Sequence, residues 1–159
     1  MNEILFRGKC ISTGEWVEGA LLPCDDGTMY IATSMLDPPE DGGPAMVACH
    51  LVYGNTVCRY TGLKDKNDKR IFEGDIYTWR DDYNDYHACL ICFGEYFDRG
   101  ANRYATMANG FYLKTLKGET FNFAGSGYSE IEIAGNIFDN YQLLAGEESG
   151  RTNFPRQTN

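Results

Sequence analysis

Residues 60–76 read YTGLKDKNDKRIFEGDI, and this stretch decides the fold because it places two turns between three short apolar runs. Positions 65–68 have hairpin-turn chemistry, since Asp and Asn tolerate the left-handed backbone that tight turns need. We therefore predict a hairpin with strands at 60–63 and 70–72. Glu73, Gly74 and Asp75 predict a second tight turn, which leads into a strand at 76–79.

Outside this stretch, short apolar runs alternate with turn residues, which is typical of β structure. The runs at 3–9 and 15–22 flank Ser12-Thr13-Gly14 and predict a second hairpin. Residues 37–44 contain three prolines and two glycines and predict a loop. Further strands are expected at 28–33, 45–53, 87–93, 111–116 and 131–137.

A helical pattern is rare in this chain. Residues 140–145 predict a turn or two of helix, with Asp139 or Asn140 as the N-cap and Gly146 as the stop. Among its 159 residues are 11 Tyr, 9 Phe and 18 Gly, a mixture that favours strands and tight turns. We predict one β-rich domain over residues 1–146, followed by a flexible polar tail at 147–159.

The charge of the chain is strongly acidic, with 14 basic and 23 acidic residues and a net charge of −9. Such a protein lacks the basic surface that provides most non-specific affinity for nucleic acid, so a nucleic-acid partner is unlikely. No apolar run reaches the roughly 20 residues of a membrane span, and the N-terminus has no secretion signal. These observations predict a cytoplasmic protein without a membrane partner.

Cysteine usage indicates reduced thiols and no metal site. Only Cys89 and Cys92 have the C-x-x-C spacing of a zinc or redox motif. They lie in an apolar run that predicts a buried strand, where residues three apart point to opposite faces. A second pair of ligands at similar spacing is also missing. We predict six reduced cysteines, no bound metal and no cofactor.

Three groups of residues resemble the YopX family of phage and prophage proteins. The central stretch is similar to the family's long signature, in which Asp68 here replaces the usual Gly. Residues 3–9 with 15–19, and 132–140 with Leu143 and Leu144, resemble its opening and closing segments, so the resemblance covers nearly the whole chain. The motif residues, which we interpret as a structural turn, are Tyr60, Thr61, Gly62, Leu63, Asp65, Asn67, Glu73, Gly74 and Asp75.

The resemblance implies a phage-encoded accessory protein in a bacterial host cytoplasm, and it carries over no reaction and no catalytic residue. For the fold we expect a mainly β protein with little helix. Its short antiparallel strands would form a small SH3-like or partly open barrel, followed by one short C-terminal helix. The SH3-like comparison rests on the G-D-I turn at 74–76 and is a fold-level analogy without functional content.

Enzymatic alternatives involve few residues. His87 and Cys89 would share one strand face, so a thiol–imidazole pair is conceivable, although no orienting or oxyanion element accompanies it. Glu73 and Asp75 could form a carboxylate pair, but the turn at Gly74 separates them. The acids at 81–85 could bind a cation or simply form a solvated loop.

Three classes of function follow from these features. The first is a protein-interaction module that uses surface aromatic residues to bind a host or phage protein, with homo-oligomerisation also possible. The second is a nucleic-acid-associated small barrel that stacks bases on aromatic rings. The third is a hydrolase or thiol enzyme that uses Cys89 and His87. We favour the first, a non-enzymatic module.

Overall fold

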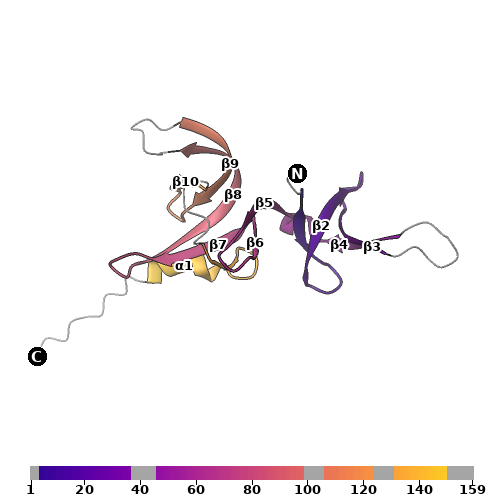
Figure 1. Ribbon diagram of the computed structural model, residues 1–159, viewed down its shortest axis with the longest axis horizontal. Helices are drawn as coiled ribbons and strands as arrows, with labels where there is room; N and C mark the ends of the chain where they lie inside the picture. The colour runs from indigo at the N-terminus through magenta and orange to yellow at the C-terminus, as the bar shows by residue number, and fades with distance from the viewer. Residues whose placement is uncertain (1–3, 37–45, 99–105, 124–130, 150–159) are drawn as a thin grey trace, which may run out of the picture. The chain divides into compact units, whose positions relative to one another are not determined.

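The computed structural model describes residues 4–36, 46–98, 106–123 and 131–149 (Figure 1). As predicted, the protein is mainly β, with two antiparallel sheets and one short C-terminal helix. Its contacts form two compact units, namely Met1–Leu63 with Arg70–Phe72, and Lys64–Lys69 with Glu73–Asn159. We call these the first and the second unit. The single domain over 1–146 and the tail at 147–159 stay predictions, and the loop predicted at 37–44 lies outside the described residues.

The first unit contains a six-stranded sheet in the order β4-β3-β2-β1-β5-β6. Its elements are β1 (Phe6–Lys9), β2 (Trp16–Pro23), β3 (Met29–Leu36), β4 (Met46–Val52), the 3₁₀ turn η1 (Gly54–Thr56), β5 (Cys58–Lys64) and β6 (Arg70–Phe72). The predicted hairpin of 3–9 with 15–22 is confirmed, because β1 pairs with β2 from Phe6↔Gly19 to Lys9↔Trp16. The strands predicted at 28–33 and 45–53 are β3 and β4.

This sheet curls until the end of β4 reaches the end of β1. Cys10 forms an isolated bridge with Val52, and the Ile11 amide donates to the Leu51 carbonyl at 2.9 Å. Small residues permit the curl: a Cβ on Gly8 would lie 3.1 Å from Ile31 and Val52, which are both buried. Among the described residues this contact is one bridge and not a ladder, so the sheet is not a closed barrel.

The second unit contains a five-stranded sheet in the order β10-β9-β8-β7-β11. Its strands are β7 (Asp75–Arg80), β8 (Tyr86–Asp98), β9 (Thr106–Lys114), β10 (Thr120–Asn122) and β11 (Ile133–Asn136). Strands were predicted at 76–79, 87–93, 111–116 and 131–137, and all four are present. β8 and β9 are longer than predicted, and β10 was not predicted at all.

Two glycines explain why β8 and β9 are longer than the sequence predicts. Gly94 and Gly110 end the predicted runs, yet they lie opposite each other in the β8–β9 ladder. Their φ angles of +137° and +152° are open to glycine and rarely adopted by other residues. The paired glycines let both strands bend together without breaking the ladder, and Figure 1 shows this curvature.

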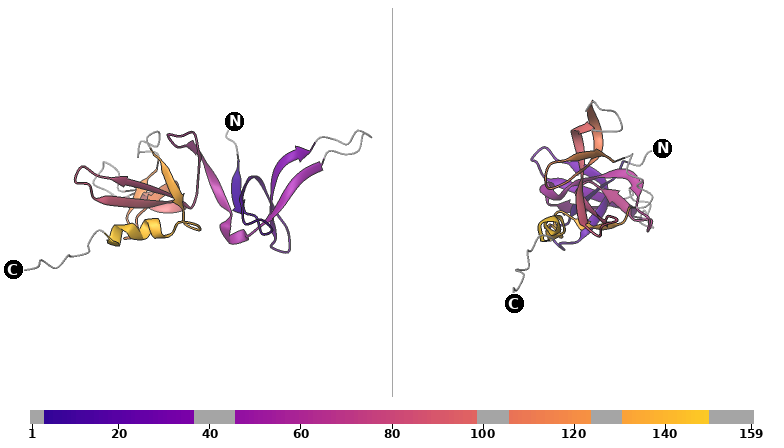
Figure 2. Two further views of the ribbon diagram at one scale, coloured as in Figure 1. Left: turned by 90° about the horizontal axis from the view of Figure 1, so that it is seen from below. Right: turned by 90° about the vertical axis from the view of Figure 1, so that its left-hand side faces the viewer.

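Helix α1 (Gln142–Ser149) lies along one face of the second sheet (Figure 2). Leu144 packs with Ile76 and Ala88 in a buried cluster, and the Tyr86 hydroxyl donates to the Leu143 carbonyl at 3.0 Å. The predicted stop at Gly146 was wrong, because the helix continues to Ser149. A glycine inside a helix lowers the stability of that helix by about 1 kcal/mol. The packing of the helix against the sheet can offset this loss. The described part of the chain contains no helix long and apolar enough to cross a membrane.

Gly19 provides a sharp test of the first sheet. A Cβ at this position would overlap the backbone carbonyl oxygen of Ala32 on β3, which cannot move without disturbing the β2–β3 ladder. We expect Gly19→Ala to lower the free energy of unfolding by about 3 kcal/mol or more, as measured by urea denaturation. Gly54→Ala is the control, because its Cβ would make only ordinary contact, 3.6 Å from the Met29 sulfur. Equal stability of the two variants would contradict this packing.

Candidate functional site

The hairpin turn of the motif is organised by the carboxylate of Asp65, which is buried. Its Oδ1 accepts hydrogen bonds from the backbone amides of Asn67, at 2.9 Å, and Lys69, at 3.0 Å. The backbone closes the same turn, since the Asp65 amide donates to the Lys69 carbonyl and the Asp68 amide donates to the Asp65 carbonyl. The hairpin turn predicted at 65–68 is confirmed.

The same carboxylate also binds a distant strand. Asp65 Oδ2 accepts from the amide of Ile133, the first residue of β11, at 3.2 Å, and the Lys66 amide donates to the Ile131 carbonyl at 2.9 Å. Burial alone would raise the pKa of Asp65, but the donors at Lys69, Ile133 and Asn67 outweigh it and hold the pKa below its ordinary value. Asp65 therefore stays ionised and ties the turn to β11.

Asp68 occupies the fourth position of this turn, where the resembling signature has glycine. Its φ is +64°, in the left-handed region that Asp tolerates better than most residues. The turn therefore forms with Asp at this position. Its exposed carboxylate accepts from Lys64 Nζ at 2.8 Å, a surface ion pair of small energetic value.

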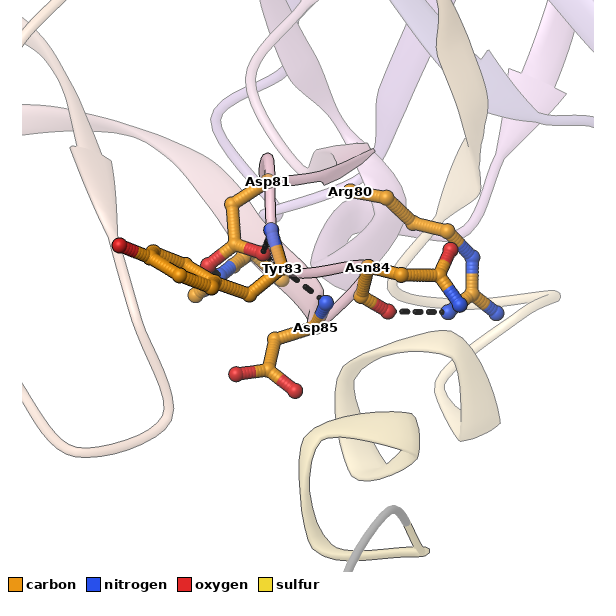
Figure 3. A network of polar contacts seen from close by, with 6 residues as sticks. Arg80, Asp81, Tyr83, Asn84 and Asp85 are labelled. Carbon is orange, nitrogen blue, oxygen red and sulfur yellow. Dashed lines mark hydrogen bonds and ion pairs between the residues drawn. The ribbon is translucent and has the colours of Figure 1, made fainter.

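The acidic loop at 81–85 repeats this turn in the β7–β8 hairpin (Figure 3). Asp81 Oδ1 accepts from the amides of Tyr83, at 3.0 Å, and Asp85, at 2.9 Å, and Asn84 has a φ of +65°. These bonds hold the pKa of Asp81 below its ordinary value, and His87 contributes most to this shift. The carboxylate of Asp85 points away from that of Asp81 in Figure 3. The loop is an ordered hairpin turn and not a preformed cation site.

Two further hairpins close in the same way, at 24–28 and 115–119. In each, the first amide donates to the fifth carbonyl and the fourth residue, Gly27 or Gly118, has a positive φ. Among these four turns, Asp65 is distinguished by its bond to a remote strand. The buried position of its carboxylate, and not the turn itself, makes the motif hairpin special.

The second half of the motif is also a turn, as predicted. Gly74 has a φ of +79°; its amide donates to the Ile91 carbonyl and its carbonyl accepts from the Ile137 amide, both at 2.8 Å. The following Asp75 is only 1% exposed. That burial removes Asp75 from solvent and gives no support to an acid/base pair with Glu73.

The first half of the motif forms strand β5. The Thr61 hydroxyl donates to the Ile71 carbonyl at 2.8 Å and accepts from the Leu63 amide at 3.2 Å. Gly62 has a φ of +84°, and the rings of Tyr60 and Phe72 lie 5.4 Å apart between centroids. These contacts bind β5 to β6 within the first unit. Tyr60 contributes a side-chain contact to this pairing, and Thr61 contributes hydrogen bonds with the backbone.

The proposed thiol–imidazole pair has no support in the geometry. Cys89 is 0% exposed, whereas His87 stacks on Trp79 at 5.0 Å between centroids and its Nε2 lies 3.0 Å from Asp81 Oδ2. The strand predicted at 87–93 is confirmed, and its alternation places Cys89 and Cys92 on opposite faces. Within the described ranges, no three His, Cys, Asp or Glu side chains converge as metal ligands.

Cys10 has an unusual environment that the sequence analysis missed. The Ser12 hydroxyl, 3.3 Å from the sulfur, and the Thr13 amide lower the pKa of this thiol to about 6. The turn sequence Cys10-Ile11-Ser12-Thr13-Gly14 is a signal for such bonding. Cys10 is nevertheless buried, and it lies in the bridge to Val52.

The described part of the second unit includes two hollows of different size. The larger, about 510 Å³, lies where β8 and β9 curl over β10, and the rings of Tyr96 and Tyr112 stack in it at 4.8 Å between centroids. Burial raises the pKa of both tyrosines, so their hydroxyls stay protonated. The smaller, about 240 Å³, is lined by Leu90, Lys114, Leu116, Ile137, Tyr141 and Leu144, among others. Besides the two tyrosines, the larger hollow is lined by Glu95, Lys114, Glu119 and Thr120, whose hydroxyl donates to the Phe97 carbonyl at 2.8 Å.

The second unit also has an exposed aromatic face, which lies on the side of the sheet opposite to the side that α1 covers. In the β8–β9 ladder Phe93 pairs with Phe111 and Phe97 pairs with Met107, and Phe121 on β10 pairs with Leu113. We call Phe93, Phe97, Met107, Phe111 and Phe121 the aromatic face. The alternation of side chains places them on one side of the sheet, while Ala88 and Leu90 face the helix.

Comparison with known families gives one match, and it covers most of the chain. The profile of the family described as YopX protein matches residues 6–145. The chain belongs to the YopX family. A comparison with curated proteins finds no match. The interpretation of the motif residues as a structural turn stays a prediction. The aromatic face lies outside the motif and is the candidate site for binding.

The role of Asp65 in the YopX motif can be measured against Asp81, which forms the same turn without a remote bond. We expect Asp65→Asn to lower the free energy of unfolding by about 1–3 kcal/mol, because a buried amide loses its acceptor. Asp81→Asn should cost less than about 1 kcal/mol, since water replaces its lost bonds. Urea denaturation of both variants provides the measurement. Equal losses would show that the bond to Ile133 contributes nothing.

The same carboxylate predicts a pH dependence. The pKa of Asp65 in the folded protein lies below the unfolded value of about 3.9. The contribution of Asp65 to the free energy of unfolding is therefore complete above that pH. The contribution is lost as the pH falls through the folded pKa. The stability difference between the wild type and Asp65→Asn should therefore shrink between neutral pH and about pH 3. A difference that stays constant in urea titrations at the two pH values would contradict this.

Proposed function

We propose that this YopX-family protein is a non-enzymatic protein-interaction module, a phage- or prophage-derived accessory factor that binds a host or phage protein. One observation carries the proposal, namely the aromatic face of the second unit. Phe97 and Met107, which lie opposite each other in the ladder, are 57% and 58% exposed. Phe93 and Phe121 are exposed as well.

Two ladder pairs of apolar residues, Phe93 with Phe111 and Phe97 with Met107, lie on this one face, with the polar pair Glu95 and Asn109 between them. Single apolar side chains on a surface need no explanation, whereas a larger group of them with polar neighbours is typical of a binding site. The rings of Phe93 and Phe111 touch edge to face at 4.9 Å between centroids, so the patch has an ordered centre. Aromatic and Met side chains are also the types that interfaces enrich, because they offer large contact area at low entropic cost.

The first unit supports a finer description of the fold. Its strand order β4-β3-β2-β1-β5, its 3₁₀ turn between β4 and β5, and the bridge from β4 to β1 suit a partly open SH3-like barrel. We include this SH3-like architecture in the proposal. Because small barrels support many unrelated functions, it carries no functional weight by itself.

A nucleic-acid role is the principal alternative. The aromatic face could stack bases, as aromatic platforms in single-strand-binding proteins do. The net charge of −9 opposes it, since phosphate contacts supply most of the affinity of such proteins. The buried thiol of Cys89 gives a hydrolase or thiol enzyme no comparable support.

The test compares a variant of the aromatic face with a control variant at an exposed aromatic residue outside that face. A partner captured from bacterial host lysate and identified by mass spectrometry is titrated against the purified protein. We expect the double variant Phe97→Ala, Met107→Ala to weaken binding by roughly tenfold or more. Tyr83→Ala is the control, because Tyr83 is 88% exposed in the same unit but lies on the β7–β8 turn.

The outcomes separate the hypotheses. A partner that binds the double variant as tightly as the wild type would remove the aromatic face from the proposal. Duplex and single-stranded DNA should bind no tighter than about 10⁻⁴ M at physiological salt. Micromolar binding of DNA that weakens steeply with added salt would replace the interaction module with the nucleic-acid alternative.

A further inference from the structure

Strand β9 has an outer edge that is only partly paired. One edge of the strand pairs with β8 from Thr106 to Lys114, whereas the outer edge pairs with β10 only at Tyr112, Leu113 and Lys114. No strand in the described ranges continues the outer pairing along residues 106–111. Figure 1 shows the beginning of β9 at the upper rim of the second unit. About half of the strand is therefore open to another backbone.

The turn after β9 shows which residues direct their backbone groups to the open edge. The Thr115 amide donates to the Glu119 carbonyl, toward β10. Because backbone polar groups alternate between the two edges of a strand, Met107, Asn109 and Phe111 direct their N–H and C=O groups to the same side. Within the described part of the chain, no backbone group outside the β8–β9 ladder bonds to these three residues.

The bonds of β8 confirm this direction on both sides of the glycine bend. The Ile91 carbonyl accepts from the Gly74 amide, and the Phe97 carbonyl accepts from the Thr120 hydroxyl. Both carbonyls point away from β9, so the even-numbered residues of β8 are those that bond to β9. Even-numbered residues of β8 lie opposite even-numbered residues of β9. The odd-numbered residues of β9 are therefore left for the outer edge.

This edge lacks the features that normally prevent strands of different molecules from pairing. Proteins protect exposed edge strands with Lys, Pro or bulges. β9 reads TMANGFYLK, so residues 106–113 contain no charged residue and no proline. Its ladder with β8 runs from residue 106 to residue 114 without a register shift, so no bulge interrupts it. The open edge is a template for another strand.

The open segment complements a second copy of itself. In an antiparallel pair centred on Asn109, the two Asn109 side chains are opposite each other, and each amide offers a donor and an acceptor to the other. Met107 lies opposite Phe111 of the second copy, and a Met sulfur beside an aromatic ring is a favourable contact. These side chains share one side of the sheet, so the two aromatic faces would join into one surface.

Charge and order favour a second β9 over an unrelated peptide. Each copy carries a net charge of −9, so two copies repel where acidic surfaces meet. Glu95 lies opposite Asn109 on β8, and in the pair the two Glu95 residues would be three strand spacings apart, about 14 Å. That separation exceeds the Debye length of about 8 Å at physiological salt. A second β9 is already ordered by its own β8, whereas a peptide would lose conformational entropy on binding.

We propose that two copies of this protein pair through residues 107–111 of β9, antiparallel and centred on Asn109, so that their β8–β9 hairpins form one sheet across a two-fold axis. A pairing of five residues suits a weak dimer that depends on protein concentration. The proposal goes beyond the binding function proposed above, and the dimer would present a doubled aromatic surface to a partner. Because association is measured with the purified protein alone, the failure of one proposal is distinguishable from the failure of the other.

Sedimentation of the purified full-length protein tests the association. We expect the wild type to show a concentration-dependent dimer, and Asn109→Lys to raise its dissociation constant by roughly tenfold or more, because two ammonium groups would face each other. Asn109 is exposed and lies opposite Glu95, so the substitution is compatible with the fold. Tyr83→Lys is the control with the same change of charge, because Tyr83 is exposed on the β7–β8 turn. A wild type that stays monomeric, or an Asn109→Lys variant that dimerises as well as Tyr83→Lys, would overturn the proposal.

Cross-linking tests the register. In a hydrogen-bonded antiparallel pair the two Cα atoms at position 109 would lie about 5.5 Å apart, within reach of a short bismaleimide. The exposed cysteines are first removed from the full-length protein by Cys24→Ser and Cys49→Ser. In this background Asn109→Cys should give a covalent dimer, and Tyr83→Cys, the matched control, should not. Equal cross-linking of the two variants, or none in either, would overturn a pair centred on Asn109.

Discussion

The carboxylate of Asp65 is the interaction on which the architecture of the second unit depends. One oxygen accepts the two amides that shape the hairpin turn, and the other accepts the amide of Ile133 on β11. A neutral side chain could form some of these bonds, but an ionised acceptor forms them more strongly and in a buried place. Gly74 adds a second tie, because its amide and carbonyl bind Ile91 and Ile137. The two turns of the YopX motif thereby fix the strands from which the sheet is built.

Local chemistry made much of this fold predictable. The positive φ of Gly74 and of Asp68 follows from residue type and turn position, and the hairpins follow from alternating apolar runs. Three features could not be predicted from the sequence, and each has a physical reason. The bend at Gly94 and Gly110 depends on their being opposite each other, which no local pattern reveals. The helix passes Gly146 because tertiary packing outweighs propensity, and the bond from Asp65 to Ile133 joins residues 68 positions apart.

The sequence predicts only the kind of candidate site, namely an interaction surface of aromatic residues, and not its position. The abundance of Tyr and Phe indicated an interaction surface, but most aromatic residues in any domain are buried, and sequence alone cannot separate the two groups. The ladder pairing of Phe97 with Met107 and their exposure identify the surface. Conversely, the motif that dominates the sequence contributes its polar groups to backbone bonds. Family signature and candidate binding surface are therefore different parts of the molecule, and substitutions in one and the other should affect different properties.

The four matching hairpin turns have a consequence for how this surface can diversify. Each turn constrains its first residue, which receives the closing bonds, and its fourth, which must accept a left-handed backbone. In the β7–β8 turn the two positions between them are Asp82 and Tyr83, and the Tyr83 side chain is 88% exposed. Other turns use these positions for further contacts, because Lys66 forms an ion pair with Glu132 and Asp26 accepts from the Thr28 amide and hydroxyl. Charge, size and polarity can therefore change at the tip of the β7–β8 turn while its strands keep their register, which gives the scaffold an exchangeable surface position.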